Sequence, residues 1–122
     1  MSAPAALLVV EDEYLVAAFL DRALRLHGYT VTGPCHTVAE AMQAIAEPAA
    51  RIDGAVLDVA LRGGETSLPV AQELHQRGIP FLFLTGDDRI VRSGQAGAAA
   101  VLIKPVSLPR LIEAVGAMLS AP

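Results

Sequence analysis

The sequence predicts an α/β protein in which five strands form one parallel sheet that helices cover on both faces. Apolar runs of strand length alternate with segments of helical period along the whole chain, which is typical of repeated βα units. Of the 122 residues, 53% are hydrophobic, enough for a single packed core but not for a second domain. We therefore expect one domain over residues 1–122, with its core at residues 5–120 and frayed ends.

The first two βα units lie in the first 50 residues. A strand at residues 6–10 precedes a helix that ends at Gly28, a residue type that favours the left-handed backbone after a helix. The helix face that we expect to be buried comprises Val16, Phe19, Leu20, Ala23 and Leu24. The second strand is short, residues 30–32, and the second helix begins with a capping box of Thr37 and Glu40 and ends before a proline.

The third unit has a strand at residues 55–58 and a loose stretch at residues 62–64. A helix follows, with Ser67 as its cap and Pro69 in its first turn. It ends at Gly78.

The last part of the chain holds two further strands, at residues 81–85 and 99–103. Both are apolar without alternation, as expected of strands that are buried on both faces. A helix between them, at residues 87–97, should be short and mobile because glycines interrupt it. The final helix begins at Ser107 and is expected to bury Leu108, Leu111, Ile112, Val115 and Leu119.

Charge and composition narrow the choice of partners. With a formal net charge of -4 and a pI of about 5.2, we expect no direct nucleic-acid binding and a protein as partner. No apolar run approaches the ~20 residues of a membrane-spanning helix, and no signal peptide is recognisable, so we expect no membrane attachment and a cytoplasmic location. The single cysteine, Cys35, excludes an internal disulfide and is expected in the core.

Polar side chains collect where the predicted strands end. The first strand is followed by Glu11 and Asp12, the third ends in Asp58, the fourth in Thr85, and the fifth is followed by Lys104. Ligands of open parallel sheets bind at the carboxyl ends of the strands. We therefore expect these acid, hydroxyl and amine groups to converge on one crevice.

The carboxylates of this crevice call for a cation. Two carboxylates ~4 Å apart repel by about 4 kcal/mol at a partly screened site, and hard oxygen ligands suit a hydrated Mg²⁺. The alternative for Asp12 is a helix cap. The alternative for Asp58 is a turn-capping carboxylate, which the apolar residues 59–61 that follow make a poorer explanation.

Lys104 and Thr85 would supply fixed donors. Lys104 is the one lysine beside eight arginines and precedes Pro105, and a lysine suits a point-charge contact to one phosphate oxygen. The alternatives are an ammonium that extends to solvent and, for Thr85, a turn that leads into Gly86. Together these groups meet the needs of phosphoryl transfer, with Asp58 as the nucleophile that forms an acyl phosphate.

This order of residues, Glu11 and Asp12, then Asp58, Thr85 and the pair Lys104-Pro105, resembles the receiver domain of two-component response regulators along essentially the whole chain. The resemblance implies a flavodoxin-like (βα)5 fold, doubly wound with strand order 2-1-3-4-5. It implies a phosphoacceptor, not an enzyme with its own substrate, which takes a phosphoryl group from a sensor histidine kinase or phosphotransfer protein. A downstream protein target would read the phosphorylated state, with the chain a monomer or weak homodimer.

The resemblance also assigns ligands and modulating residues. It implies Mg²⁺ held by Asp12, Asp58 and the backbone carbonyl of Ala60, with Glu11 assisting through water. It implies a cis bond between Lys104 and Pro105. Asp87, two residues past Thr85, would help to position the water that removes the phosphoryl group.

Several positions depart from the usual receiver pattern. Val101 stands where receivers usually carry an aromatic that rotates on phosphorylation, and Arg62 and Val106 replace a common proline and phenylalanine. Residues 80–86 look like a receiver subgroup, often stand-alone, that is named for a Phe-Ala-Thr-Gly-Gly/Tyr signature. Signalling would then run through ordering of residues 86–97.

Two other kinds of protein explain these residues less well. A small Mg²⁺-dependent phosphatase or phosphotransferase of the haloacid-dehalogenase type would carry a second acid where this chain has Ala60. A degenerate receiver or nucleotide-binding module would lack core residues that are all present here, and the turn after the first strand has no glycine-rich loop. His27, His36 and His75 are explained by helix ends or loops and none is persuasive as a phosphodonor.

Overall fold

In the computed structural model, residues 3–86 and 97–121 are described, and they form a parallel sheet of five strands in the order β2-β1-β3-β4-β5. The elements are β1 (Ala6–Val10), α1 (Tyr14–Leu26), β2 (Thr30–Cys35), α2 (Val38–Ala46), β3 (Gly54–Asp58), a short 3₁₀ turn η1 (Arg62–Gly64), α3 (Leu68–Gln76), β4 (Phe81–Thr85), β5 (Ala100–Ile103) and α5 (Leu108–Ser120). The predicted fold class and strand order are confirmed. The predicted helix and mobility of the segment after β4 fall on residues 87–96, outside the described residues.

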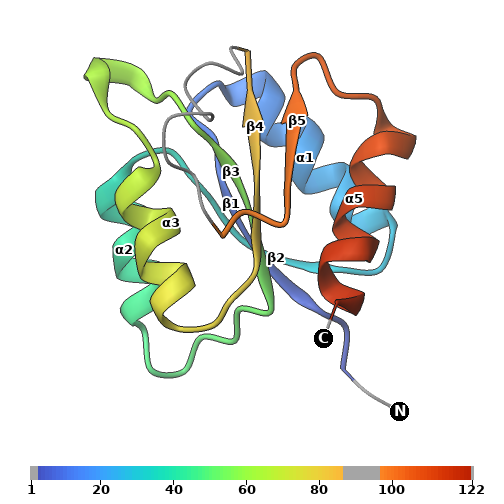
Figure 1. Cartoon of the computed structure of the whole chain (residues 1–122), viewed down its shortest axis with the longest axis horizontal. Helices are drawn as coiled ribbons and strands as arrows, with labels where there is room; N and C mark the ends of the chain where they lie inside the picture. The colour runs from blue at the N-terminus through green and yellow to red at the C-terminus, as the bar shows by residue number, and fades with distance from the viewer. Residues whose placement is uncertain (1–2, 87–96, 122) are drawn as a thin grey trace.

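Helices cover both faces of the sheet, with α2 and α3 on one side and α1 and α5 on the other (Figure 1). Each face has its own apolar cluster, because alternate residues of a strand point to opposite sides. Leu57 and Phe83 pack toward α2 and α3, whereas Leu7 and Leu82 pack toward α1 and α5. None of the described helices has the length and apolar character that crossing a bilayer requires.

Strand β2 is longer than predicted and ends at Cys35. The sequence predicted a strand over residues 30–32 only, but the pairing with β1 shifts register between Leu8 and Val10 and continues, with Val10 opposite Cys35. Gly33 has a φ of 96°, and a Cβ there would lie 2.5 Å from the backbone nitrogen of Cys35. A glycine is thus required for this shift, and Cys35 is buried as expected.

Three expectations about burial were wrong. Phe19 is 42% exposed, because it lies about 100° around the helix from Leu20, at the margin of a narrower buried stripe. Leu108, in the first turn of α5, is 36% exposed. Strand β5 is only partly buried because it is an edge strand, and its Ile103 is 49% exposed.

The helix caps are partly as predicted. The Glu40 backbone N–H donates to Thr37 Oγ1 over 3.1 Å, but the Glu40 carboxylate accepts from the Thr37 hydroxyl instead of the backbone, so the capping box is one-sided. Ser107 caps α5 through a 3.3 Å bond from a backbone N–H. Ser67 precedes α3, yet its side chain makes no cap bond, and the Oγ1 of Thr66 accepts from the first turn instead.

Candidate functional site

The register of the sheet brings the predicted site residues to one edge. Val10 pairs with Leu57, so the residues that follow them, Glu11 and Asp58, are neighbours at the ends of β1 and β3. Asp58 pairs with Leu84, the residue before Thr85. The backbone N–H of Lys104 donates to the carbonyl of Thr85 over 2.8 Å. Four strands therefore present their polar residues side by side.

Three carboxylates form the centre of the site. Oxygen atoms of Glu11, Asp12 and Asp58 lie within 4.8 Å of one another, and the three residues are only 0%, 7% and 6% exposed. One oxygen of Asp12 accepts a 2.7 Å hydrogen bond from the backbone of Arg62, whose guanidinium lies 3.5 Å from the same oxygen. Hard oxygen donors this close together fit a divalent cation such as Mg²⁺.

Lys104 bridges two of these acids. Its Nζ lies 2.9 Å from Glu11 Oε1 and 3.3 Å from Asp58 Oδ2. The bond that follows, between Lys104 and Pro105, is cis, as the resemblance implied. The ammonium thus lies within direct reach of the Asp58 carboxylate, not in solvent.

Burial and charge shift the proton affinity of this cluster. Burial raises the pKa of Asp58 from its usual 3.8 to about 7, and the nearby Glu11 adds to the rise while Lys104 opposes it. Burial alone would lower the pKa of Lys104, but the hydrogen bond with Glu11 and the charge of Asp58 raise it above its usual value. A divalent cation bound beside Asp58 would favour the ionised form of its carboxylate.

The remaining residues that the sequence assigned to the site differ in burial and position. Thr85 is buried at the end of β4, beside Asp58 as the register requires. Ala60 is exposed two residues after Asp58, and its carbonyl stays a predicted ligand. Val101 packs against the cluster on the α2 and α3 side. Asp87 lies outside the described residues.

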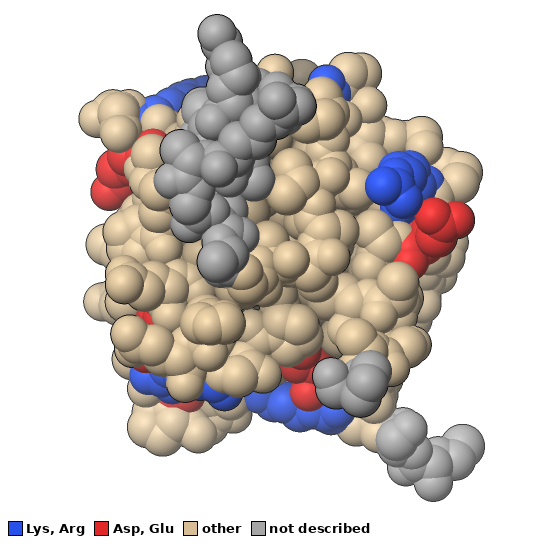
Figure 2. Space-filling view, in the orientation of Figure 1, with Lys and Arg blue, Asp and Glu red and all other residues tan. Residues whose placement is uncertain are grey.

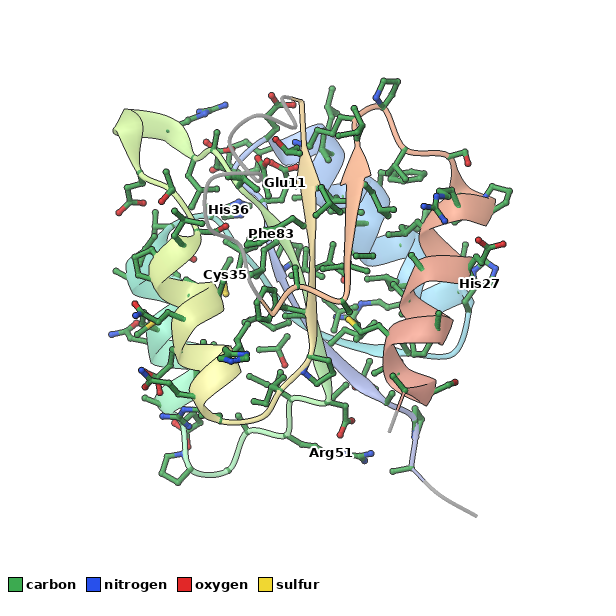
Figure 3. All side chains as sticks on the ribbon, in the orientation of Figure 1. Glu11, His27, Cys35, His36, Arg51 and Phe83 are labelled. Atoms are coloured by element: carbon green, nitrogen blue, oxygen red, sulfur yellow. The ribbon has the colours of Figure 1, made fainter. Side chains whose placement is uncertain are left out.

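His36 is a neighbour of the site that the sequence did not point to. Its Nδ1 lies 2.9 Å from the backbone oxygen of Glu11, and Figure 3 shows the two residues close together at the carboxyl edge of the sheet. The sequence did not predict this contact, because β2 was expected to end at residue 32 and His36 was therefore assigned to a loop.

Charged side chains are dispersed on one face of the molecule. On the face that Figure 2 shows, the described Lys and Arg side chains lie in separate small groups near the margin, several of them beside Asp or Glu. Such scattered pairs offer no continuous basic stripe on this face for a phosphate backbone.

A model of the response regulator receiver domain matches residues 7–116. The chain belongs to this receiver domain family. It is 33% identical over 116 residues to the transcriptional regulatory protein PdtaR of Mycobacterium tuberculosis. The aligned region covers 92% of this chain and 55% of that protein. This receiver therefore spans about half the length of the curated relatives it matches.

Solved structures of similar proteins agree with the fold. The receiver is 42% identical to SdrG from Sphingomonas melonis Fr1, over 98% of this chain and 99% of that one, with a TM-score of 0.81. It is 28% identical to the HemR receiver domain from Leptospira biflexa, over 97% and 96% of the two chains, with a TM-score of 0.80. The two-component assignment thus rests on both sequence and fold.

Proposed function

We propose that this receiver is a phosphorylation-dependent switch of a two-component phosphorelay, in which Asp58 accepts a phosphoryl group from a sensor histidine kinase or phosphotransfer protein. The observation that carries the proposal is the group of three carboxylates within 4.8 Å of one another, with an ammonium 3.3 Å from Asp58. A nucleophile, a cation site and a fixed donor are the parts that phosphoryl transfer requires.

The acidic residues fit Mg²⁺, with Asp12, Asp58 and the carbonyl of Ala60 as proposed ligands and Glu11 assisting through water. When bound, Mg²⁺ would neutralise part of the carboxylate charge and polarise a phosphoryl oxygen. Arg62 would then share Asp12 Oδ2, which it contacts here.

The chemistry follows from the side chains. An oxygen of the Asp58 carboxylate attacks the phosphorus of the donor, and the bond from phosphorus to the donor's nitrogen breaks, with its electron pair leaving on that nitrogen. The product is an acyl phosphate on Asp58. Lys104 transfers its contact from the carboxylate to one phosphoryl oxygen, and the hydroxyl of Thr85 donates to another. Hydrolysis by water restores Asp58, with Asp87 as a proposed orienting group.

A protein donor is supported by apolar surface beside the site. A hollow of about 540 Å³ runs from Lys104 and Pro105 to α1 and is lined by Leu15 and Phe19. Leu15 is 88% and Phe19 is 42% exposed, and neighbouring exposed apolar side chains of this kind mark surfaces that bind other proteins. The phosphoryl donor would pack on this hollow as it presents its phosphorylated group to Asp58.

The output would differ from that of receivers with an aromatic in β5. Val101 is partly buried against the α2 and α3 side, and its short side chain offers no rotating ring. We propose that residues 86–97, which follow Thr85, respond instead and that a downstream protein reads them. A cytoplasmic receiver that is a monomer or weak homodimer fits this role.

The test is phosphorylation by acetyl phosphate with Mg²⁺, followed by mass spectrometry of the intact protein. We expect the mass to increase by one phosphoryl group in the wild type and not in Asp58→Asn. Asp21→Asn, which changes an acid on the outer side of α1, is the matched control and should be labelled normally. An unlabelled wild type, or label that persists in Asp58→Asn, would overturn the proposal.

A further inference from the structure

The imidazole of His36 is a part of the site that the proposed function does not use. It directly follows β2, is half-buried, and its Nδ1 lies 2.9 Å from the backbone oxygen of Glu11. Because a carbonyl oxygen can only accept, Nδ1 is the nitrogen that carries a proton. This hydrogen bond therefore fixes the orientation of the ring relative to the end of β1.

The backbone of Glu11 is held from both sides by the same segment. Its N–H donates to the carbonyl of Cys35 over 2.9 Å, and its own carbonyl accepts from the next residue, His36. The peptide groups before and after Glu11 are thus tied to two successive residues of one neighbouring segment. Asp12 follows directly, so its starting position is set by the same pair of bonds.

The ring of His36 also contacts the far end of this turn. The centroids of the Tyr14 and His36 rings are 4.9 Å apart with an interplanar angle of 52°. Within the turn, the N–H of Glu13 donates to the Glu11 carboxylate over 3.3 Å. One imidazole thus touches residue 11 at the start of the turn and residue 14 at the start of α1, on either side of Asp12.

We propose that His36 is a positioning residue of the cation site, which holds the Glu11 and Asp12 carboxylates in place through the hydrogen bond from Nδ1 to the Glu11 carbonyl. The inference rests on the proposed function, since it takes these acids as part of a Mg²⁺ site. Groups that orient the ligands of a metal contribute to its affinity without touching it. His36 acts in this way through the backbone.

The experiment is a titration with MgCl₂ alone, at one pH, followed by amide chemical shifts of the protein. His36→Ala should weaken Mg²⁺ binding by about 10-fold, the lower end of the loss that follows removal of a group that orients metal ligands. In His36→Asn, the side-chain amide nitrogen takes the place of Nδ1, and we expect an affinity within about 2-fold of the wild type. His36→Phe keeps a ring for Tyr14 but has no donor, and it should bind as weakly as His36→Ala.

His27 provides the matched control. Its Nδ1 lies 3.0 Å from the backbone oxygen of Ala23, the same kind of bond at the end of α1 remote from the site (Figure 3). His27→Ala removes an equivalent bond and should leave Mg²⁺ affinity unchanged. The amide spectra of the variants also report whether each one is folded.

The outcomes separate this inference from the proposed function. Wild-type affinity in His36→Ala, or rescue by His36→Phe but not by His36→Asn, would overturn the positioning role. A wild type that does not bind Mg²⁺ would overturn both the cation site and the inference. Loss of phosphorylation on Asp58 with intact, His36-dependent Mg²⁺ binding would remove the phosphoacceptor assignment alone.

Discussion

Replacing Asp58 by asparagine should stabilise the protein when no divalent cation is present. The change removes one of three carboxylate charges that lie within 4.8 Å of one another. At an effective dielectric constant of about 20, the repulsion between Asp58 and each of the other two carboxylates at that distance costs about 3.5 kcal/mol. The attraction between Asp58 and the Lys104 ammonium at 3.3 Å contributes about 5 kcal/mol in the opposite direction. The two repulsions outweigh the attraction by about 2 kcal/mol, and burial of the charge adds to this cost.

The raised pKa of Asp58 also predicts that ionised Asp58 lowers the free energy of unfolding, and it defines the pH range over which this loss develops. With a pKa of about 7 instead of 3.8, the folded wild type holds a proton between these values that the unfolded chain has released. The free energy of unfolding therefore falls as pH rises through this window, by up to about 4 kcal/mol above pH 7. The Asp58→Asn variant lacks this loss. We expect it to be about 2–4 kcal/mol more stable than the wild type at pH 8.

The assay is urea unfolding in EDTA at pH 8 and pH 5, followed by circular dichroism. The advantage of Asp58→Asn should fall to less than half at pH 5, where Asp58 of the wild type is mostly protonated. Added MgCl₂ should narrow the gap at pH 8 by stabilising the wild type. Asp21→Asn, which loses an exposed pair with Arg25, should show no such gain. A variant that is less stable than the wild type at pH 8, or an advantage independent of pH, would refute the reasoning.

Three further predictions concern Lys104, Cys35 and Leu15. Lys104→Met should lower the free energy of unfolding in EDTA at pH 8 by about 3 kcal/mol, because the fully buried carboxylate of Glu11 loses its ion pair with the ammonium of Lys104. An unchanged urea midpoint would show that this ion pair does not stabilise the fold. Burial raises the pKa of Cys35 to about 11, so a disulfide reagent should label it at pH 8 at least about 100-fold faster in urea than in the folded protein. Leu15→Ser should slow phosphorylation by the cognate kinase but leave the rate of phosphorylation by acetyl phosphate unchanged. Leu26 is 71% exposed and does not line the hollow, so Leu26→Ser should leave both rates unchanged.

The sequence predicted most reliably what is local or strongly periodic. Strands β1 and β4 are uninterrupted apolar runs, and their ends were predicted to the residue. The site could be anticipated because a parallel sheet collects the carboxyl ends of its strands at one edge. Phe19 and Leu108 were assigned to the core wrongly, since hydrophobicity alone does not show how wide a stripe the sheet can cover. The cap of α3 was missed because neighbouring hydroxyls at residues 66 and 67 compete for one role.

The least predictable feature, the continuation of β2 through Gly33, is also the one that links the fold to the detail of the site. A Cβ at Gly33 would lie 3.1 Å from the backbone oxygen of Val9 as well as 2.5 Å from the nitrogen of Cys35. Because glycine permits this close approach, the strand reaches Cys35, whose carbonyl accepts a hydrogen bond from the backbone N–H of Glu11. The next residue, His36, binds the carbonyl of Glu11. A residue type that normally ends a strand thus brings a second segment against the acidic turn. The geometry of that turn depends on the β2 edge as much as on β1 and β3.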